Sequence, residues 1–231
     1  MTEHTVKSFE EELNKLSAEC ARMGGLTEAQ VADALTAVVK RNQELAGAVV
    51  GRDDKLDVAE REIERRAIRL IALRQPMADD LRRTVAAMKI ANNLERCGDL
   101  AKNIAKRTLV IIESDPLTPL TRSIDRMGKL VVQRLTAVLD AYARADLERA
   151  LAVWSQDEDV DEHYNSLFRE LLTYMMSDPR TINPCAHLLF VAKNLERIGD
   201  HATNIAEIVH YELTGEDVIS ANRPKTDALR A

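Results

Sequence analysis

The feature of this chain that most constrains its fold is a twenty-residue segment that occurs twice. The first copy, residues 90–109, reads IANNLERCGDLAKNIAKRTL, and the second, residues 191–210, reads VAKNLERIGDHATNIAEIVH; they agree at 11 of 20 positions without a gap. Unrelated segments of average composition would agree at about one or two positions. An acidic segment upstream is repeated too, as RDDKLD at residues 52–57 and QDEDVD at residues 156–161. The chain is therefore expected to contain two copies of one unit of about a hundred residues.

The composition and the apolar periodicity both favour helices. Only 8 glycines, 6 prolines and 3% aromatic residues occur in 231 residues, so residues that form turns and strands are scarce. Apolar residues recur with a helical period over three stretches of each unit, residues 8–39, 43–74 and 76–112, and then 116–143, 146–176 and 179–213. Asn42 and Asp146 are the expected caps between helices, and Gly24-Gly25 is an expected irregularity within the first. The predicted fold is all-α: two tandem three-helix bundles, with domains 1–113 and 114–215 and a polar, flexible tail, 216–231.

Charge and cysteine content narrow the class of protein. The chain has 38 acidic and 32 basic residues and a formal charge of −6, which excludes a strongly basic nucleic-acid binder. Its 3 cysteines are an odd number without CxxC spacing, which suits a reducing cytoplasm. We find no apolar signal core at the start and no uncharged stretch of the length of a membrane span, so membrane contact is expected only through partners.

Carboxylates occupy helix positions where apolar residues are expected. Asp53 lies between Val49 and Leu56 on an apolar face, and an acid-x-x-x-Asp pair recurs on the next helix and in the second unit. Burying several carboxylates together is costly unless cations or hydrogen bonds compensate. Oxygen ligands without cysteine suit hard cations such as Mg²⁺ or Mn²⁺, or iron. The sequence therefore predicts two metal sites, formed by Asp53, Asp57, Glu95 and Asp99 in the first unit and by Asp157, Asp161, Glu196 and Asp200 in the second.

Other interpretations of the same residues remain open. The acids could instead pair with neighbouring arginines: Arg52, Arg61, Arg65, Arg66, Arg96 and Arg197. His201 could join a metal shell, although its counterpart is Leu100, and Glu207-x-x-His210 is one half of a di-iron motif that needs two such pairs. Cys97 is expected to be a core residue. Glycines beside the acids, Gly98 and Gly199, indicate close approach of another backbone or of a ligand, because glycine within a helix costs about 1 kcal/mol relative to alanine.

The twin N-L-E-R-x-G-D segments, the acidic pairs, and the stretches IRLIALRQP and FRELLTYM resemble the PhoU family of phosphate-specific transport accessory proteins, over residues 3–213. The resemblance implies a fold of two three-helix bundles related by pseudo-twofold symmetry. It also implies a cytoplasmic, non-enzymatic regulator that represses the phosphate-starvation response when phosphate is plentiful. It implies that the chain is a homodimer that links the ATPase subunit of the phosphate ABC transporter to a membrane sensor histidine kinase. It also implies multinuclear metal clusters at the eight carboxylates.

Two alternatives to a non-enzymatic adaptor, a protein that links the transporter to the kinase, are also consistent with the sequence. One is a helical metalloenzyme, a phosphohydrolase or redox protein, because metals bridged by carboxylates can activate water. It would need a general base distinct from the ligands, and none is evident. The other is a purely structural bundle in which the acids form salt bridges.

Overall fold

A computed structural model describes residues 2–156 and 158–218 of the chain, and every regular element in these ranges is helical. The elements are, in chain order, α1 (Thr2–Lys40), α2 (Gln43–Arg52), α3 (Asp54–Arg74), α4 (Ala78–Ile111), α5 (Thr118–Arg144), α6 (Leu147–Ser155), α7 (Glu158–Ser177), the short 3-10 helix η1 (Pro179–Thr181) and α8 (Ile182–Thr214). Each repeat thus consists of a long helix, a helix pair in place of one middle helix, and a second long helix. The prediction of two tandem three-helix bundles is confirmed.

Local hydrogen bonds explain where the helices begin. The Asn42 side chain accepts from the Leu45 amide at 3.0 Å, and the Asp146 side chain accepts from the Arg149 amide at 3.0 Å, so both predicted caps are confirmed. A proline in the first turn opens α5, where a missing amide hydrogen costs nothing. Most helix ends lie within a few residues of the predicted ones, but α1 begins at Thr2, well before the predicted start at residue 8.

Two local predictions were wrong, one about the glycines of α1 and one about the middle helix of each repeat. Gly24 and Gly25 do not interrupt α1, which runs without a break from Thr2 to Lys40. A Cβ atom at Gly24 would lie 2.6 Å from Leu139 of α5, so this glycine lets two helices approach closely within a regular helix.

The middle helix of the first repeat, predicted as one element, is divided at Asp53. There the Leu56 amide bonds to the Asp53 carbonyl, three residues back, although the Asp53 backbone keeps helical dihedral angles. The second repeat is divided at the equivalent place, between α6 and α7.

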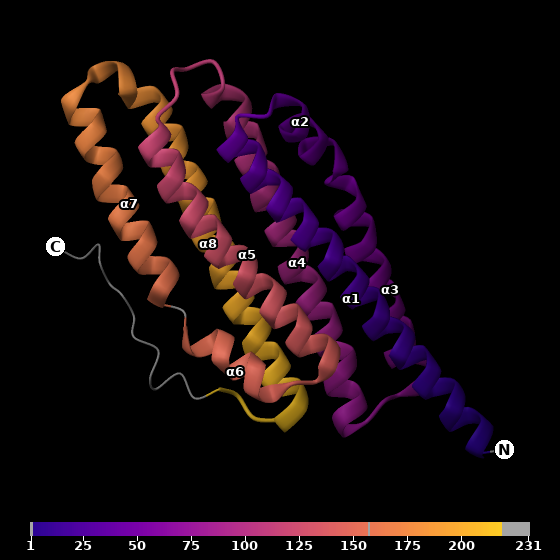
Figure 1. Cartoon of the computed structure of the whole chain (residues 1–231). Helices are drawn as coiled ribbons and strands as arrows, with labels where there is room; N and C mark the ends of the chain where they lie inside the picture. The colour runs from indigo at the N-terminus through magenta and orange to yellow at the C-terminus, as the bar shows by residue number, and fades with distance from the viewer. Residues whose placement is uncertain (1, 157, 219–231) are drawn as a thin grey trace.

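The two long C-terminal helices of the repeats lie at the centre of the molecule (Figure 1). The contact between α4 and α8 is the most extensive, and α1 also packs against α5. Outside them, α3 and α7 lie at opposite edges. The buried apolar side chains of both repeats form one continuous core. The predicted division at residues 113 and 114 therefore separates sequence repeats whose helices pack together, and residues 219–231 of the predicted tail lie outside the described residues.

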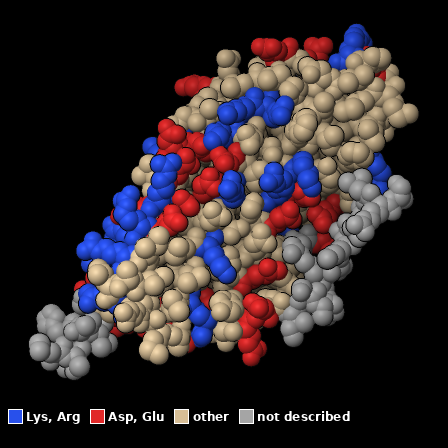
Figure 2. All heavy atoms as spheres, turned by 180° about the vertical axis from the view of Figure 1, so that it is seen from behind, with Lys and Arg blue, Asp and Glu red and all other residues tan. Residues whose placement is uncertain are grey.

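No helix in the described part of the chain is long and apolar enough to cross a membrane. The face opposite to that of Figure 1 carries acidic and basic side chains interleaved with one another (Figure 2). This distribution agrees with the small net charge, and it suits neither a nucleic-acid surface nor a basic membrane-binding face.

Candidate functional site

The first acidic set, Asp53, Asp57, Glu95 and Asp99, lies where α3 packs against the middle of α4. The Asp53 side chain is 8% exposed, whereas those of Asp57 and Asp99 are about one-third exposed. Burial raises the pKa of the Glu95 carboxyl, and the charges of Asp99 and then Asp57 raise it further, against the opposing effect of Arg96. The structure thus brings the four predicted side chains of this repeat close to one another.

A lysine that sequence reasoning did not single out lies among these acids. The Lys102 ammonium donates to Asp53 Oδ2 and, at 2.7 Å, to Asp99 Oδ1. Hydrogen bonds to Asp53 and then to Asp99 raise the pKa of Lys102 above its ordinary value, against a smaller opposing effect of burial. Lys102 therefore bridges α3 and α4 as a charged donor.

Asp53 has a second partner, from α1. Gln30 is 5% exposed, and its Nε2 donates to Asp53 Oδ1 and to the Gly98 carbonyl, both at 3.3 Å. A Cβ atom at Gly98 would lie 2.3 Å from Leu56 Cδ1. The close approach expected at this glycine is thus confirmed, but its origin was predicted wrongly, because a leucine side chain makes it rather than a backbone or a ligand.

The arginines near the acidic motifs pair with them only in part. Arg61 lies 3.8 Å from Asp57, and Arg96 lies 3.5 Å from Glu95 and 4.0 Å from Asp99. These are long contacts made by exposed arginine side chains, and such contacts contribute little to stability.

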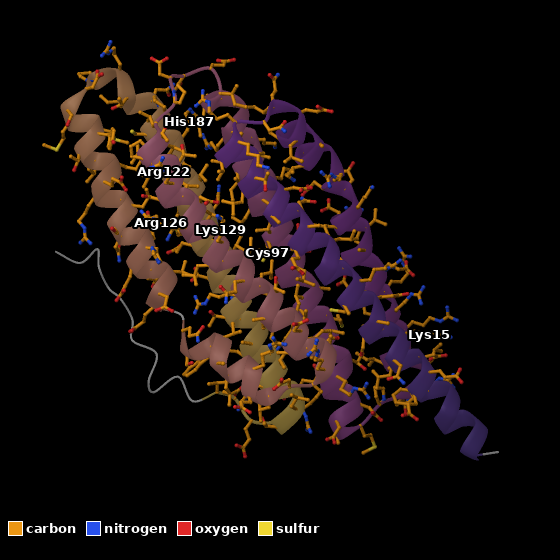
Figure 3. The ribbon with its side chains drawn as sticks, in the orientation of Figure 1. Lys15, Cys97, Arg122, Arg126, Lys129 and His187 are labelled. Atoms are coloured by element: carbon orange, nitrogen blue, oxygen red, sulfur yellow. The ribbon has the colours of Figure 1, made fainter. Side chains whose placement is uncertain are left out.

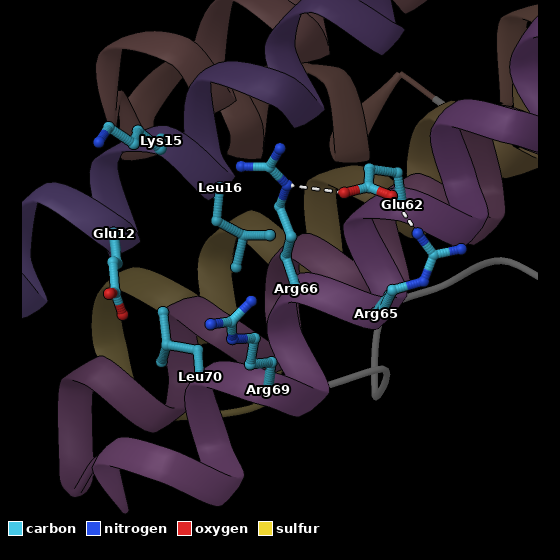
Figure 4. Close-up of a pocket in the computed structure, with 8 residues that line it drawn as sticks. All are labelled: Glu12, Lys15, Leu16, Glu62, Arg65, Arg66, Arg69 and Leu70. Atoms are coloured by element: carbon cyan, nitrogen blue, oxygen red, sulfur yellow. Dashed lines mark hydrogen bonds and ion pairs between the residues drawn. The ribbon is translucent and has the colours of Figure 1, made fainter.

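Other arginines pair elsewhere. Arg52 pairs with Asp33, while Arg65 and Arg66 both donate to Glu62 at one end of a groove between α1 and α3 (Figure 4). This groove has a volume of about 380 Å³ and is lined by Glu12, Lys15, Leu16, Glu62, Arg65, Arg66, Arg69 and Leu70.

The second acidic set, Asp157, Asp161, Glu196 and Asp200, differs in its surroundings. Asp157 lies outside the described residues. Glu196 Oε1 accepts from Lys193 Nζ at 2.5 Å, while Glu196 Oε2 is buried and has no hydrogen-bond partner. The Lys193 ammonium also lies 5.3 Å from the centre of the Tyr164 ring. Gly199 packs less tightly than Gly98, since a Cβ atom there would lie 3.4 Å from Val160.

A buried arginine on α5 lies beside this part of the second repeat. Arg134 is 3% exposed, and its Nη2 donates to the Val153 carbonyl at 3.3 Å. Val153 is at the end of α6, one turn before Asp157 in the sequence.

The weaker candidates have other partners. His201 Nδ1 lies 2.9 Å from Asn93 Oδ1 across the α4–α8 contact, and burial followed by the charges of Arg197 and Arg96 lowers the His201 pKa. Trp154 Nε1 donates to Glu207 at 3.1 Å, and His210 Nδ1 lies 3.0 Å from the Glu216 carbonyl oxygen. The two ends of the half di-iron motif therefore have separate partners.

The core assignment of Cys97 is confirmed. Its side chain is fully buried on α4, within the bundle (Figure 3), and burial raises its pKa.

Comparison with known proteins gives the family. The sequence model of the PhoU domain matches residues 20–108 and 124–209, one match in each repeat. The chain belongs to the PhoU family. It is 68% identical over 229 residues to a "Phosphate-specific transport system accessory protein PhoU homolog" of Caulobacter vibrioides, covering 99% of both chains, and 49% identical over 224 residues to a protein of the same description from Rhizobium meliloti, covering 97% of this chain and 94% of that protein.

Solved PhoU structures agree with this assignment. The crystal structure of PhoU from Pseudomonas aeruginosa has a TM-score of 0.87 and 39% identity, covering 90% of this chain and 100% of that one. The phosphate transport system regulatory protein PhoU of Streptococcus pneumoniae has a TM-score of 0.82 and 29% identity, covering 91% and 99%.

The arrangement around the first acidic set does not fit the metal cluster that the PhoU resemblance implies. Lys102 already joins Asp53 to Asp99, and its positive charge opposes a second cation. Within residues 2–156 and 158–218, no three side chains of Cys, His, Asp or Glu converge as a metal site. In the second set the unpartnered Glu196 oxygen is a suitable ligand atom. Metal binding by the eight carboxylates stays a prediction.

Sequence reasoning missed the basic and amide side chains around the acids, although the repeat carries a signal for them. Lys102 aligns with Thr203, and Gln30 aligns with Arg134. A change of charge between equivalent positions of a duplicated unit marks the places where the two PhoU repeats differ chemically.

Proposed function

We propose that this chain is a cytoplasmic, non-enzymatic regulator of phosphate uptake and of the phosphate-starvation response. The observation that carries the proposal is the full-length similarity to PhoU proteins described as accessory or regulatory proteins of phosphate transport. In this role the chain links the ATPase subunit of the phosphate ABC transporter to a sensor histidine kinase and represses signalling when phosphate is plentiful. We expect it to act as a homodimer, which light scattering of the purified protein tests directly.

The packing of the two repeats suits an adaptor. Because one continuous core joins them, a partner bound to one repeat and a partner bound to the other are held in a fixed relative orientation. Transporter state can then bias the kinase through a rigid body that carries both contacts.

The adaptor role is tested by deleting the gene and measuring a phosphate-regulated reporter at high phosphate. Derepression on deletion, together with recovery of both the ATPase subunit and the kinase in a pull-down with the tagged protein, supports the proposal. An unchanged reporter and recovery of neither partner would refute it.

The metalloenzyme alternative is tested separately. The protein purified without chelator is assayed with phosphate esters and for oxidase activity, alongside Glu95→Gln and Glu196→Gln and an exposed control on α3, Glu64→Gln. Turnover that is lost in the first two variants and kept in the control would favour an enzyme. We expect no turnover, because Asp53 and Asp99 are already joined by Lys102.

A further inference from the structure

The groove between α1 and α3 of the first repeat combines apolar and basic side chains, and it shares no residue with the two acidic sets. Leu16 of α1 and Leu70 of α3 line its floor and are 1% and 5% exposed. Its remaining walls include four basic side chains: Lys15 of α1 and Arg65, Arg66 and Arg69 of α3 (Figure 4). A molecule bound in this groove would therefore meet positive charge as well as apolar surface.

The two carboxylates that line the groove already have donors from this chain. Glu62 accepts from Arg65 at 2.5 Å and from Arg66 at 3.1 Å, and Glu12 accepts from Arg74 at 3.1 Å. Each acid therefore has at least one arginine of its own, and neither needs the remaining cations of the groove as a partner.

Lys15 and Arg69 are the cations that remain. Both are exposed, and neither forms a hydrogen bond or an ion pair with another described residue. The hydrogen bond from Arg74 lowers the pKa of Glu12 against the effect of burial, and the charges of Arg69 and Lys15 lower it further. Since Glu12 is already paired with Arg74, Lys15 and Arg69 are available to an anion from outside the chain.

The second repeat does not reproduce this excess of positive charge. Three of the four basic residues are replaced there by uncharged or acidic ones: Lys15 by Pro119, Arg66 by Glu170 and Arg69 by Thr173. Glu170 accepts from Ser123 Oγ at 2.8 Å, so the sign of the charge at this position is reversed. The basic groove is therefore particular to the first repeat, although both repeats share one helical pattern.

An exposed leucine adds to the apolar part of this surface. Leu73 is 67% exposed and lies one turn beyond Arg69, on the same face of α3. Residues 62–73 present this face over roughly 17 Å, which is about three helical turns. A small oxyanion would pair with the cations and leave Leu73 in water, whereas a helix that carries both carboxylates and apolar side chains would cover both.

We propose that the groove between α1 and α3 binds an acidic, amphipathic helix of a partner protein, whose carboxylates pair with Lys15 and Arg69 and whose apolar side chains cover Leu73. The formal charge of the whole chain is −6, so most of its surface disfavours an acidic segment and the basic groove directs where one docks. This inference goes beyond the proposed regulatory role, and it holds whether or not the partner takes part in phosphate signalling.

The experiment measures binding of a fluorescent peptide to the full chain by fluorescence anisotropy. The probe is a helical peptide of about 15 residues with leucine and glutamate on one face, and a second probe carries lysine in place of glutamate. We expect the acidic probe to bind with a dissociation constant on the order of micromolar and the basic probe not to bind. Lys15→Glu and Arg69→Glu should each weaken binding about fivefold or more.

The apolar contact is tested by Leu73→Ser, which should weaken binding about tenfold, and this loss should persist at about 0.5 M NaCl. The matched control for charge is Arg122→Glu, which makes the same change at an exposed position of α5 and should bind as the wild type. All four substitutions are at exposed positions, so melting temperatures are expected to stay close to that of the wild type.

Other occupants of the groove are tested as competitors, with tripolyphosphate and with vesicles of phosphatidylcholine and phosphatidylglycerol in equal parts. The proposal is overturned if the acidic probe does not bind, if the Lys15 and Arg69 variants bind it as the wild type does, or if Arg122→Glu weakens binding equally. It is also overturned if Leu73→Ser binds the probe unchanged, or if tripolyphosphate or the vesicles bind more tightly than the probe with the same dependence on Lys15 and Arg69. Those last results would assign the groove to a small oxyanion or to a lipid surface.

Discussion

Gly98 and Gly199 occupy equivalent positions of the two repeats, yet alanine is expected to have opposite effects at them. A Cβ atom at Gly98 would lie 2.3 Å from Leu56 Cδ1, which is far inside van der Waals contact. At Gly199 the nearest atom would be Val160 Cγ1 at 3.4 Å, an ordinary contact. Leu56 and Val160 are themselves counterparts, so one methylene group separates the two environments.

The magnitudes follow from two opposing terms. Replacing a helical glycine by alanine stabilises the helix by up to about 1 kcal/mol, and this gain applies at both sites. Overpacking a core costs about 1–3 kcal/mol, and it applies at Gly98 because Leu56 is 2% exposed and has little room to move. We expect Gly98→Ala to lose about 1 kcal/mol of unfolding free energy and Gly199→Ala to gain between about 0.5 and 1 kcal/mol.

Urea unfolding followed by circular dichroism measures both variants, and heating should show a difference of about 4–8 °C in melting temperature between them. The matched control is Leu56→Val, which gives the first repeat the residue of the second. In that background Gly98→Ala should become stabilising, and the double-mutant cycle gives the coupling energy between the two positions. Equal stabilisation by alanine at Gly98 and Gly199 in the wild-type background would refute the packing argument.

Two further predictions concern the end of the bundle where α5 and α8 finish. Burial raises the pKa of Glu212 to about 7 against the opposing charge of Arg83, so the folded state binds more protons than the unfolded state between about pH 4.5 and 7. The unfolding free energy should therefore fall by on the order of 2 kcal/mol as the pH rises through this window. Urea unfolding midpoints of the wild type and of Glu212→Gln, measured across the window, test this. If the unfolding free energy of Glu212→Gln fell with pH as steeply as that of the wild type, Glu212 would not be the group responsible. Arg41 has a φ of 52° and donates to the Ile112 and Ser114 carbonyls at the end of α4, while its counterpart Ala145 has the same φ beside a cavity of about 480 Å³. Ala145→Arg should raise the melting temperature by roughly 2–4 °C, because the new arginine can form equivalent bonds at the end of α8. The control is Ala152→Arg at an exposed position. A melting temperature of Ala145→Arg that is unchanged and equal to that of the control would disprove the prediction.

The helices and their starts were predictable because the signals for them are local. Asn42 and Asp146 cap helices through side-chain oxygens that reach amides three residues away, and such bonds are written in adjacent sequence. The division of the middle helix at Asp53 was not predictable in this way. The Asp53 carboxylate at this break is bonded to donors from α1 and α4, which are far from it in the sequence.

The same distinction applies to the candidate site. The spacing of Glu95 and Asp99 places both on one helix face, so their proximity follows from sequence alone. Lys102, the partner of Asp99, lies one turn further along the same helix. Its importance comes from the tertiary structure, because its ammonium also reaches Asp53, which is 49 residues away in the sequence.

The sequence by itself determined that this chain is a duplicated helical unit of the PhoU type with carboxylates on its buried faces, because periodicity and repetition are properties of the order of residues. Only the tertiary structure decided which donors the buried Asp53 and its neighbour Asp99 meet. The Lys102 ammonium meets both Asp53 and Asp99, and whether a long basic side chain meets a distant acid depends on which helices pack together and at what depth. The repeats share their sequence pattern, whereas their electrostatics are set separately by the contacts that each one makes.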